Sequence, residues 1–319
     1  MDRLGVASLR STAFQVRPLY INTVTDILIG SASWTDKTLI ACGRFYPKEC
    51  KSAEARLRYY AEQFPIVEVD SSYYGIPTPS NAQLWADRTP KSFVFNVKAF
   101  RLFTGHQTSP IVLPKDIQQA LGPDIPQVLY YRDMPEEIRG ELWRRFSEAL
   151  EPLRQCGKLG AVHFQFAPWM LRNREGHAHV EECVTHMEGL LVAVEFRNKS
   201  WFDGANASKT LAFERELGVV HTVVDGPQGF ANSVPDVWEV THPELALVRL
   251  HGRNYETWNH KGPASSSRFN YWYTVEELAA LKPEILNISR KASKVHVLFN
   301  TNYEDQGQVN ARLMRQVLG

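Results

Sequence analysis

Polar side chains stand two or four residues apart on seven short apolar segments, a spacing that places each pair on one face of a β-strand. The pairs are Glu68 with Asp70, Asn96 with Lys98, His163 with Gln165, Glu195 with Arg197, His221 with Asp225, Arg249 with His251, and His296 with Asn300. Most residues between them are Val, Leu or Phe, which suit a sheet covered by helices. We therefore expect these polar side chains to point into a common interior.

Acid–base chemistry is the first use that this set suggests. Glu195 could act as a general acid or base with Arg197 as an anion clamp, and His251 between two arginines would be a neutral base or donor at pH 7. The candidate catalytic residues are Glu195, His251, Glu68 and Asp225. The alternative is an architectural network of buried ion pairs, because such networks also perturb charges.

Substrate contacts would come from cations, amides and aromatic rings near the strand ends. Lys98 could be a Schiff-base or phosphate lysine or simply a counter-charge, and the aromatic rings could stack on a sugar or nucleobase or pack loops onto the rim. A segment from Arg253 to Arg268 reads as a lid. The expected binding residues are Trp34, Asp70, Tyr73, Tyr74, Lys98, Gln165, Arg197, Trp201, Arg249, Arg253, Arg268, Tyr273, Asn300 and Asn302.

A divalent metal is the less favoured alternative. Glu68, Glu195, Asp225 and His251 have the right donor types, but Lys98, Arg197 and Arg249 would lie on the same face and repel a cation. Three cations against four carboxylates, counting Asp70, leave about one negative charge, which is a weak attraction for a divalent ion. We expect no bound metal and no other cofactor.

Eight strand candidates alternate with amphipathic segments, and this order predicts parallel βαβ units. The strands are expected at 27–31, 66–70, 93–98, 161–166, 191–196, 219–225, 246–251 and 294–300, with helices at 52–64, 136–155, from the Thr274 capping box, and at 308–318. Gly30-Ser-Ala-Ser-Trp34 after the first strand carries no glycine-rich phosphate fingerprint. The pattern therefore predicts an α/β protein with a single (β/α)₈ TIM-type barrel over residues 27–319.

Composition bounds the remaining classes. The chain has 319 residues with 36 Lys and Arg against 35 Asp and Glu, so the net charge of +1 does not favour general attraction to nucleic acid. No apolar run is long enough to span a membrane, and four cysteines without paired short spacings indicate reduced thiols. We expect a cytoplasmic protein, with its oligomeric state left open.

Several motifs resemble those of the YecE-like family, a family of unknown function (DUF72). They are Gly30 to Trp34, Val67 to Tyr74, Phe95 to Lys98, Gln165-Phe166, Val194 to Arg197 with Ser200-Trp201, Arg249 to Arg253, and Phe299 to Asn302. The resemblance implies a TIM barrel, sometimes described as sugar-isomerase-related. Ser33, Asn198-Lys199 and Thr301 depart from the family pattern, and the N-terminal extension 1–26 lies outside it.

Three functions remain open on these residues. The first is an enzyme (an isomerase, lyase or hydrolase) that uses acid–base chemistry on a small anionic, hydroxyl-rich or phosphorylated substrate at the C-terminal face of the barrel. The second is an endonuclease-like nucleic-acid processing barrel, and the third is a non-catalytic protein that binds a small ligand.

Overall fold

A closed barrel of eight parallel strands forms the centre of the computed structural model, which describes residues 26–259 and 265–319. The first strand pairs with both the second and the eighth, so the sheet has no free edge. This confirms the predicted TIM-type fold. The strands are β1 (Asp26–Ala32), β2 (Ile66–Val69), β3 (Val94–Lys98), β4 (Leu159–Gln165), β5 (Val192–Glu195), β6 (Val220–Asp225), β7 (Leu245–Leu250) and β8 (Lys294–Phe299).

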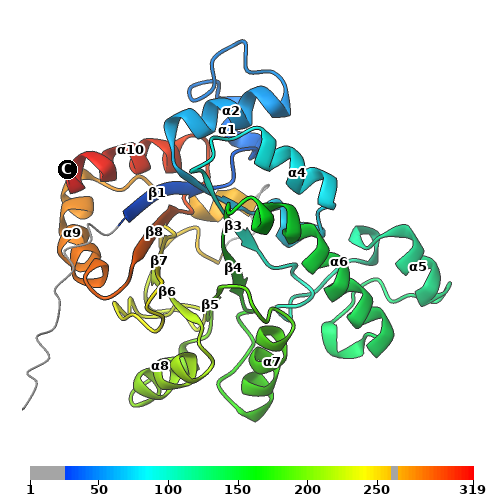
Figure 1. Cartoon of the computed structure of the whole chain (residues 1–319). Coiled ribbons are helices and arrows are strands. Elements are labelled where there is room, and N and C mark those ends of the chain that lie inside the picture. The colour runs from blue at the N-terminus through cyan, green and yellow to red at the C-terminus, as the bar shows by residue number, and fades with distance from the viewer. Residues whose placement is uncertain (1–25, 260–264) are drawn as a thin grey trace, which may run out of the picture.

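Helices form an outer layer around the ring of strands (Figure 1). They are α1 (Lys37–Cys42), α2 (Ala53–Gln63), α3 (Ser71–Tyr74), α4 (Pro79–Asp87), α5 (Lys115–Leu121), α6 (Glu136–Gln155), α7 (Arg174–Thr185), α8 (Asn206–Glu216), α9 (Val275–Ser289) and α10 (Gln306–Leu318). Short 3₁₀ segments are η1 (Pro110–Val112), η2 (Tyr131–Asp133), η3 (Lys199–Trp201) and η4 (Ser265–Phe269).

Local capping explains where the predicted helices begin. Ser52 accepts a hydrogen bond from the Ala55 amide at the start of α2, and Thr274 with Glu277 forms a complete capping box at the start of α9. The long α6 has the predicted bounds, and its buried residues recur on one face. The periodicity did not single out α4 and α8, which lie on the same outer layer.

Two separate apolar regions hold the barrel together. The larger one lies between strands and helices, and the smaller one fills the lower part of the barrel interior, here called the lumen. The lumen cluster comprises Ile66, Ala161, Ala193, Val220, Leu245, Leu247 and Leu298, all buried. Polar side chains stand above this floor, toward the C-terminal ends of the strands, where barrel proteins place their sites.

The pairing of β3 with β4 shifts register inside the lumen. Phe95 pairs with Leu159 but Val97 pairs with Val162, so β4 has one extra residue at this point. The Asn96 side chain accepts a hydrogen bond from the Ala161 amide at 3.1 Å, which satisfies the donor that the shift leaves without a strand partner. The Asn96 side chain therefore completes the hydrogen bonding of the β4 backbone.

The segment between β3 and α6 leaves the barrel, and its helix α5 projects beyond α6 (Figure 1). The predicted N-terminal extension lies outside the described residues, apart from Asp26, which begins β1. Among the helices at 26–259 and 265–319, none is long and apolar enough to cross a membrane.

Candidate functional site

Arg249 is the centre of the polar group in the lumen. It points inward from β7, is fully buried, and donates to Glu68 of β2 at 2.6 Å and to Glu195 of β5 at 2.5 Å. A third hydrogen bond, 3.2 Å long, reaches the Gln165 side chain on β4. One guanidinium thus joins three other strands across the barrel, which fixes the positions of both carboxylates.

Glu195 is held by donors on both of its oxygens. Arg197 donates to Oε1 at 2.8 Å, the Nε2 of His251 lies 3.2 Å from the same oxygen, and Arg249 occupies Oε2. Burial acts to raise the pKa of Glu195, but the charge of Arg249 and the hydrogen bonds hold that pKa well below its usual range. A carboxylate in this state is a poor proton acceptor near neutral pH.

His251 completes this arrangement as a neutral imidazole. The Asn300 amide lies 2.8 Å from Nδ1 and donates to it, so the ring proton stays on Nε2 and points at Glu195. Burial lowers the pKa of His251 to about 3, and the nearby Arg197 and Arg249 act in the same direction. The predicted neutral donor at this position agrees with the geometry, while its catalytic role stays a prediction.

A second imidazole, His163 of β4, stands between the two carboxylates. Its ring nitrogens lie 3.4 Å from Glu68 and 3.4 Å from Glu195, without satisfying hydrogen-bond geometry. Burial lowers the pKa of His163 and the charge of Arg249 adds to this effect. We call the set Glu68, His163, Gln165, Glu195, Arg197, Arg249, His251 and Asn300 the lumen network.

Beside the lumen network, Lys98 of β3 pairs with Asp70 at 2.9 Å. Burial acts to lower the pKa of Lys98, but Asp70 raises it above the ordinary value, so the amine is protonated and unsuited to forming a Schiff base. With this pair included, Glu68, Asp70 and Glu195 face Lys98, Arg197 and Arg249. Three carboxylates meet three cations, and the interior is neutral.

Asp225 and His221 are not part of this interior, so the prediction that they point inward is wrong. Val220 of β6 lies in the lumen cluster, and alternation then turns His221 and Asp225 toward the helices. His221 lies 3.0 Å from Glu214 of α8. Asp225 accepts from Arg253 at 2.8 Å and from the Tyr273 hydroxyl at 2.5 Å.

The predicted binding residues Arg253 and Tyr273 therefore lie together with Asp225, outside the lumen network. Tyr273 packs against the outward-facing Phe299 with ring centroids 5.8 Å apart. The fourth carboxylate in the predicted charge count is thus neutralised elsewhere. Within the described part of the chain, no group of three or more His, Cys, Asp or Glu is arranged to hold a metal ion.

Two of the predicted aromatic contacts also lie in the helix layer. Trp34 packs edge-on against Trp85 of α4 and against Phe95, with centroid distances of 5.9 and 6.4 Å. Trp201 is fully buried and stacks on Phe196 at 3.8 Å. The structure does not bring either ring to the lumen network. Their indoles pack the elements that surround the barrel.

Tyr73 and Tyr74, in contrast, lie at the open end of the barrel. The Lys98 ammonium stands 4.5 Å from the centre of the Tyr73 ring, and the Arg101 guanidinium stands 5.3 Å from it. His106 contacts the same ring edge-on at 5.3 Å. Tyr74 is 42% exposed. We call Asp70, Tyr73, Lys98, Arg101, His106 and Arg268 the mouth cluster.

Arg268 joins the mouth cluster from η4. Burial and the charge of Arg197 lower the pKa of Arg268, while the hydroxyls of Tyr73 and Tyr74 act in the opposite direction. Neither Arg268 nor Arg101 forms an ion pair with any residue in 26–259 or 267–319. The mouth therefore carries positive charge in excess above a neutral lumen.

Arg101 and His106 were not predicted from the sequence. Both follow β3 in an irregular segment, where no alternation marks the direction of a side chain. The position of Arg101, three residues after Lys98, is the sequence feature that could have identified it. The Thr104 hydroxyl donates to the Arg101 carbonyl at 3.1 Å, so the hydroxyl oxygen accepts a hydrogen bond from Nδ1 of His106 at 2.9 Å. Because the proton of the neutral imidazole is then on Nδ1, Nε2 of His106 is an acceptor.

Part of the predicted lid covers the lumen network. Trp258 of the predicted lid stands 4.9 Å from the Arg197 guanidinium, and Phe269, which directly follows the predicted segment, contacts the His251 ring at 5.7 Å. Residues 260–264 of that segment lie outside the described residues. Of the remaining predicted contacts, Gln165 is half-buried next to Arg249, and Asn302 is buried after β8 with an unpartnered Oδ1.

Known proteins match the chain over almost the whole barrel. The family model described as "Protein of unknown function DUF72" matches residues 28–319. The UPF0759 protein YunF of Bacillus subtilis (strain 168) is 32% identical over 295 residues, covering 92% of this chain and 94% of that protein.

Two solved structures of DUF72 family proteins have the same fold. The one from Enterococcus faecalis V583 is 29% identical with a TM-score of 0.73, covering 92% of this chain and 95% of that chain. The one from Thermotoga maritima MSB8 is 26% identical with a TM-score of 0.69, covering 92% and 99%. The chain belongs to the DUF72 family of proteins of unknown function.

Proposed function

We propose that this protein binds a small, hydroxyl-bearing anion, such as a sugar phosphate, at the barrel mouth and acts on it by acid–base chemistry. The observation that carries the proposal is the excess of cations in the mouth cluster. Arg101 and Arg268 have no carboxylate partner among the residues described, whereas every cation of the lumen network has one. Desolvated guanidiniums of this kind bind phosphate or carboxylate through charge-assisted hydrogen bonds.

The lumen network supplies the floor of this site. Arg249 holds both Glu195 and Glu68, and Glu195 in turn orients Arg197 and His251. Gln165 and Asn302 have side chains that suit a substrate hydroxyl. The aromatic face of Tyr73 closes one side, as in many sites for sugar rings.

His106 is the group of the mouth cluster that we assign to proton transfer. Burial lowers its pKa to about 3, with further lowering by Lys98, Arg101 and Arg197, so the imidazole is neutral and Nε2 accepts. A bound anion would offset these cations and raise the pKa of His106 toward the range useful for catalysis. The ligand would thus activate its own base.

Binding and exchange experiments test the two parts of this proposal. Calorimetry with inorganic phosphate and with ribose 5-phosphate measures anion binding, and NMR in D₂O measures deuterium incorporation into the sugar phosphate. Replacement of one guanidinium removes a charge-assisted hydrogen bond of about 1.5–3 kcal/mol, so Arg101→Gln and Arg268→Gln should each weaken binding about 10-fold to 100-fold. His106→Ala should abolish exchange while phosphate still binds.

Arg290→Gln is the matched control, because Arg290 is exposed at the C-terminal cap of α9, at the opposite end of the barrel. It should leave binding unchanged. Phosphate binding that neither Arg101→Gln nor Arg268→Gln weakens would contradict an anion site at the mouth. Binding without deuterium exchange for any sugar phosphate tested would favour the non-catalytic ligand-binding alternative.

A further inference from the structure

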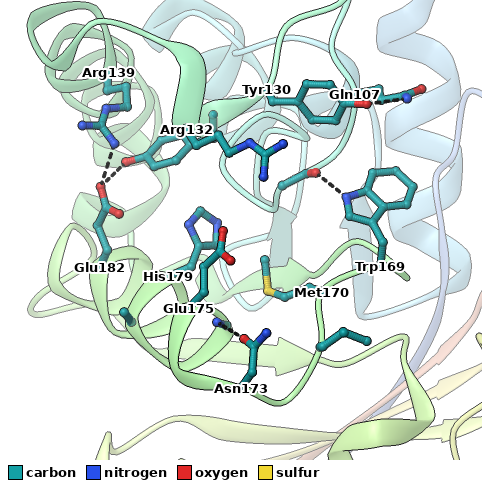
Figure 2. Close-up of a pocket in the computed structure, with 15 residues that line it drawn as sticks. Gln107, Tyr130, Arg132, Arg139, Trp169, Met170, Asn173, Glu175, His179 and Glu182 are labelled. Carbon is teal, nitrogen blue, oxygen red and sulfur yellow. Dashed lines mark hydrogen bonds and ion pairs between the residues drawn. The ribbon is translucent and has the colours of Figure 1, made fainter.

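A cavity of about 650 Å³ lies beside the barrel between α7 and the segment that connects β3 with α6. Figure 2 shows its lining residues entering from these two walls. None of the lumen network residues lines it. Its volume is in the range of sites that hold small molecules.

The α7 wall presents two hydrogen-bond acceptors on one helical face. Glu175 and His179 are four residues apart, which places their side chains next to each other. His179 donates from Nε2 to the Phe103 carbonyl at 2.8 Å, and burial lowers its pKa, so Nδ1 is an unprotonated acceptor. Glu175 has no ion-pair partner in the described part of the chain. A carboxylate beside an imidazole lone pair suits an ammonium group.

The opposite wall presents a cation. Arg132 of η2 enters the cavity across from Glu175 (Figure 2), and its side chain is 73% exposed. Its contact with Asp133 is 3.6 Å long, which is weak for an exposed pair, and it also lies over the Tyr130 ring. Arg139, the other arginine of this wall, already contacts Glu182 at 3.7 Å and Tyr131. Arg132 is therefore available to a carboxylate.

An open aromatic face lies on the side of the cavity away from Glu182 (Figure 2). The Trp169 indole donates from Nε1 to the Gly105 carbonyl at 3.1 Å, which fixes the ring, yet the residue is 52% exposed. Leu171, also on the cavity wall, is 48% exposed. Large apolar side chains exposed together and rimmed by polar groups are typical of binding sites.

We infer that this cavity binds a free amino acid with a large apolar or aromatic side chain. The ammonium group contacts Glu175 and Nδ1 of His179, the carboxylate contacts Arg132, and the side chain packs on Trp169. This site is independent of the mouth cluster, although the edge of His106 contacts Trp169 at 5.7 Å and links the two regions.

L-Phenylalanine is the probe that tests this inference, with 3-phenylpropionate lacking the amine and 2-phenylethylamine lacking the carboxylate. Binding is followed by calorimetry and by NMR of fluorotryptophan-labelled protein, in which Trp169→Phe assigns the resonance of Trp169. We expect saturable binding of L-phenylalanine that shifts this resonance. Each analogue lacks one charge-assisted contact of about 1.5–3 kcal/mol and should bind at least about 10-fold more weakly.

Two variants test which residue recognises each charged group of the amino acid. Glu175→Gln should remove the preference for L-phenylalanine over 3-phenylpropionate, and Arg132→Gln should remove the preference over 2-phenylethylamine. Glu181→Gln is the control, because Glu181 is an exposed carboxylate of α7 that does not line the cavity. It should bind as the natural chain does.

The absence of saturable L-phenylalanine binding in the millimolar range would overturn the inference, as would equal binding of all three probes. Binding that survives both Glu175→Gln and Arg132→Gln would overturn it as well. Arg101→Gln and Arg268→Gln should leave L-phenylalanine binding unchanged. Failure at this cavity is therefore distinguishable from failure of the anion site at the mouth.

Discussion

Arg249→Met removes the cation at the centre of the lumen network while keeping a side chain of similar length. Arg249, Glu68 and Glu195 are all fully buried, so the substitution leaves two carboxylates without their shared partner in a region that excludes water. His163 and His251 are neutral in the natural chain, so Arg249 is the cation that Glu68 and Glu195 share. The methionine fills part of the volume and forms no hydrogen bond with either carboxylate.

The expected loss of stability is large. Removing one partner of a buried ion pair costs about 3–5 kcal/mol, because the other charge stays buried without compensation. Here one cation serves two carboxylates, so we expect the upper part of that range. Arg144→Met is the control, since Arg144 on α6 also contacts two carboxylates but is 54% exposed. That substitution should cost less than about 1 kcal/mol.

The pH dependence separates an electrostatic loss from a packing loss. In the natural chain the pKa of Glu195 lies well below its ordinary value of 4.5, so the stability it contributes is present above that pH and is lost as the pH falls toward the folded-state pKa. In Arg249→Met the pKa of Glu195 rises because the cation that lowers it is gone, and protonation stabilises the variant as the pH falls. The two proteins should therefore converge in stability under acid conditions.

Chemical denaturation followed by far-UV circular dichroism at pH 7.5 and at pH 5 measures both effects. A difference in the free energy of unfolding below about 1 kcal/mol at pH 7.5 would refute the buried network as described. A large difference that stays constant between the two pH values would indicate lost packing and would refute the electrostatic explanation.

Three further predictions concern other parts of the barrel. Lys158→Met should cost about 1–3 kcal/mol in urea denaturation, because the buried ammonium donates to the carbonyl of Ala86 at the end of α4 and to that of Thr89 after it, and methionine donates to neither. Ser33 has a φ of 68°, so Ser33→Val should lower the melting temperature through about 1–2 kcal/mol of backbone strain, whereas Ser33→Gly should not. Elemental analysis of protein purified without chelator should find no stoichiometric metal, because the lumen carboxylates are already balanced by cations; stoichiometric zinc or manganese would contradict this.

Alternation of polar and apolar residues predicted most of the fold and the lumen. On β2, β4, β5 and β7 the apolar residues directly beside the polar ones face the helices, so the polar ones must face inward, and the structure agrees. The sixth strand differs because its Val-rich sequence is apolar on both faces. Nothing in that strand alone shows whether His221 or Thr222 points inward, and the contact that decides it, between His221 and Glu214, depends on the position of α8.

Contacts between loops could not be predicted from the sequence. Aromatic residues pack equally well on a ligand or on a helix, and Trp34 and Trp201 pack on the helix layer. Arg101 and His106 reach the mouth through a turn after β3, where periodicity gives no direction. Ser33 is a case where comparison of the motif was informative, because the family pattern has glycine at a position that adopts a positive φ.

The separation of the lumen from the mouth decides which residues could carry out the proposed acid–base chemistry. A carboxylate that accepts from Arg249, Arg197 and His251 contributes rigidity, since its proton affinity has been lowered by the same donors that fix it. Groups that respond to a ligand must instead have free hydrogen-bonding capacity. In the mouth cluster, Arg101 has an unpartnered Nε and His106 has an acceptor at Nε2. The lumen is neutral, so the electrostatic potential at the mouth is set by the cations of the mouth cluster. An anion would therefore be attracted without cancellation by the buried carboxylates. In the proposed function, the ligand's own charge would govern proton transfer, because it would raise the pKa of His106, which burial and the nearby cations lower.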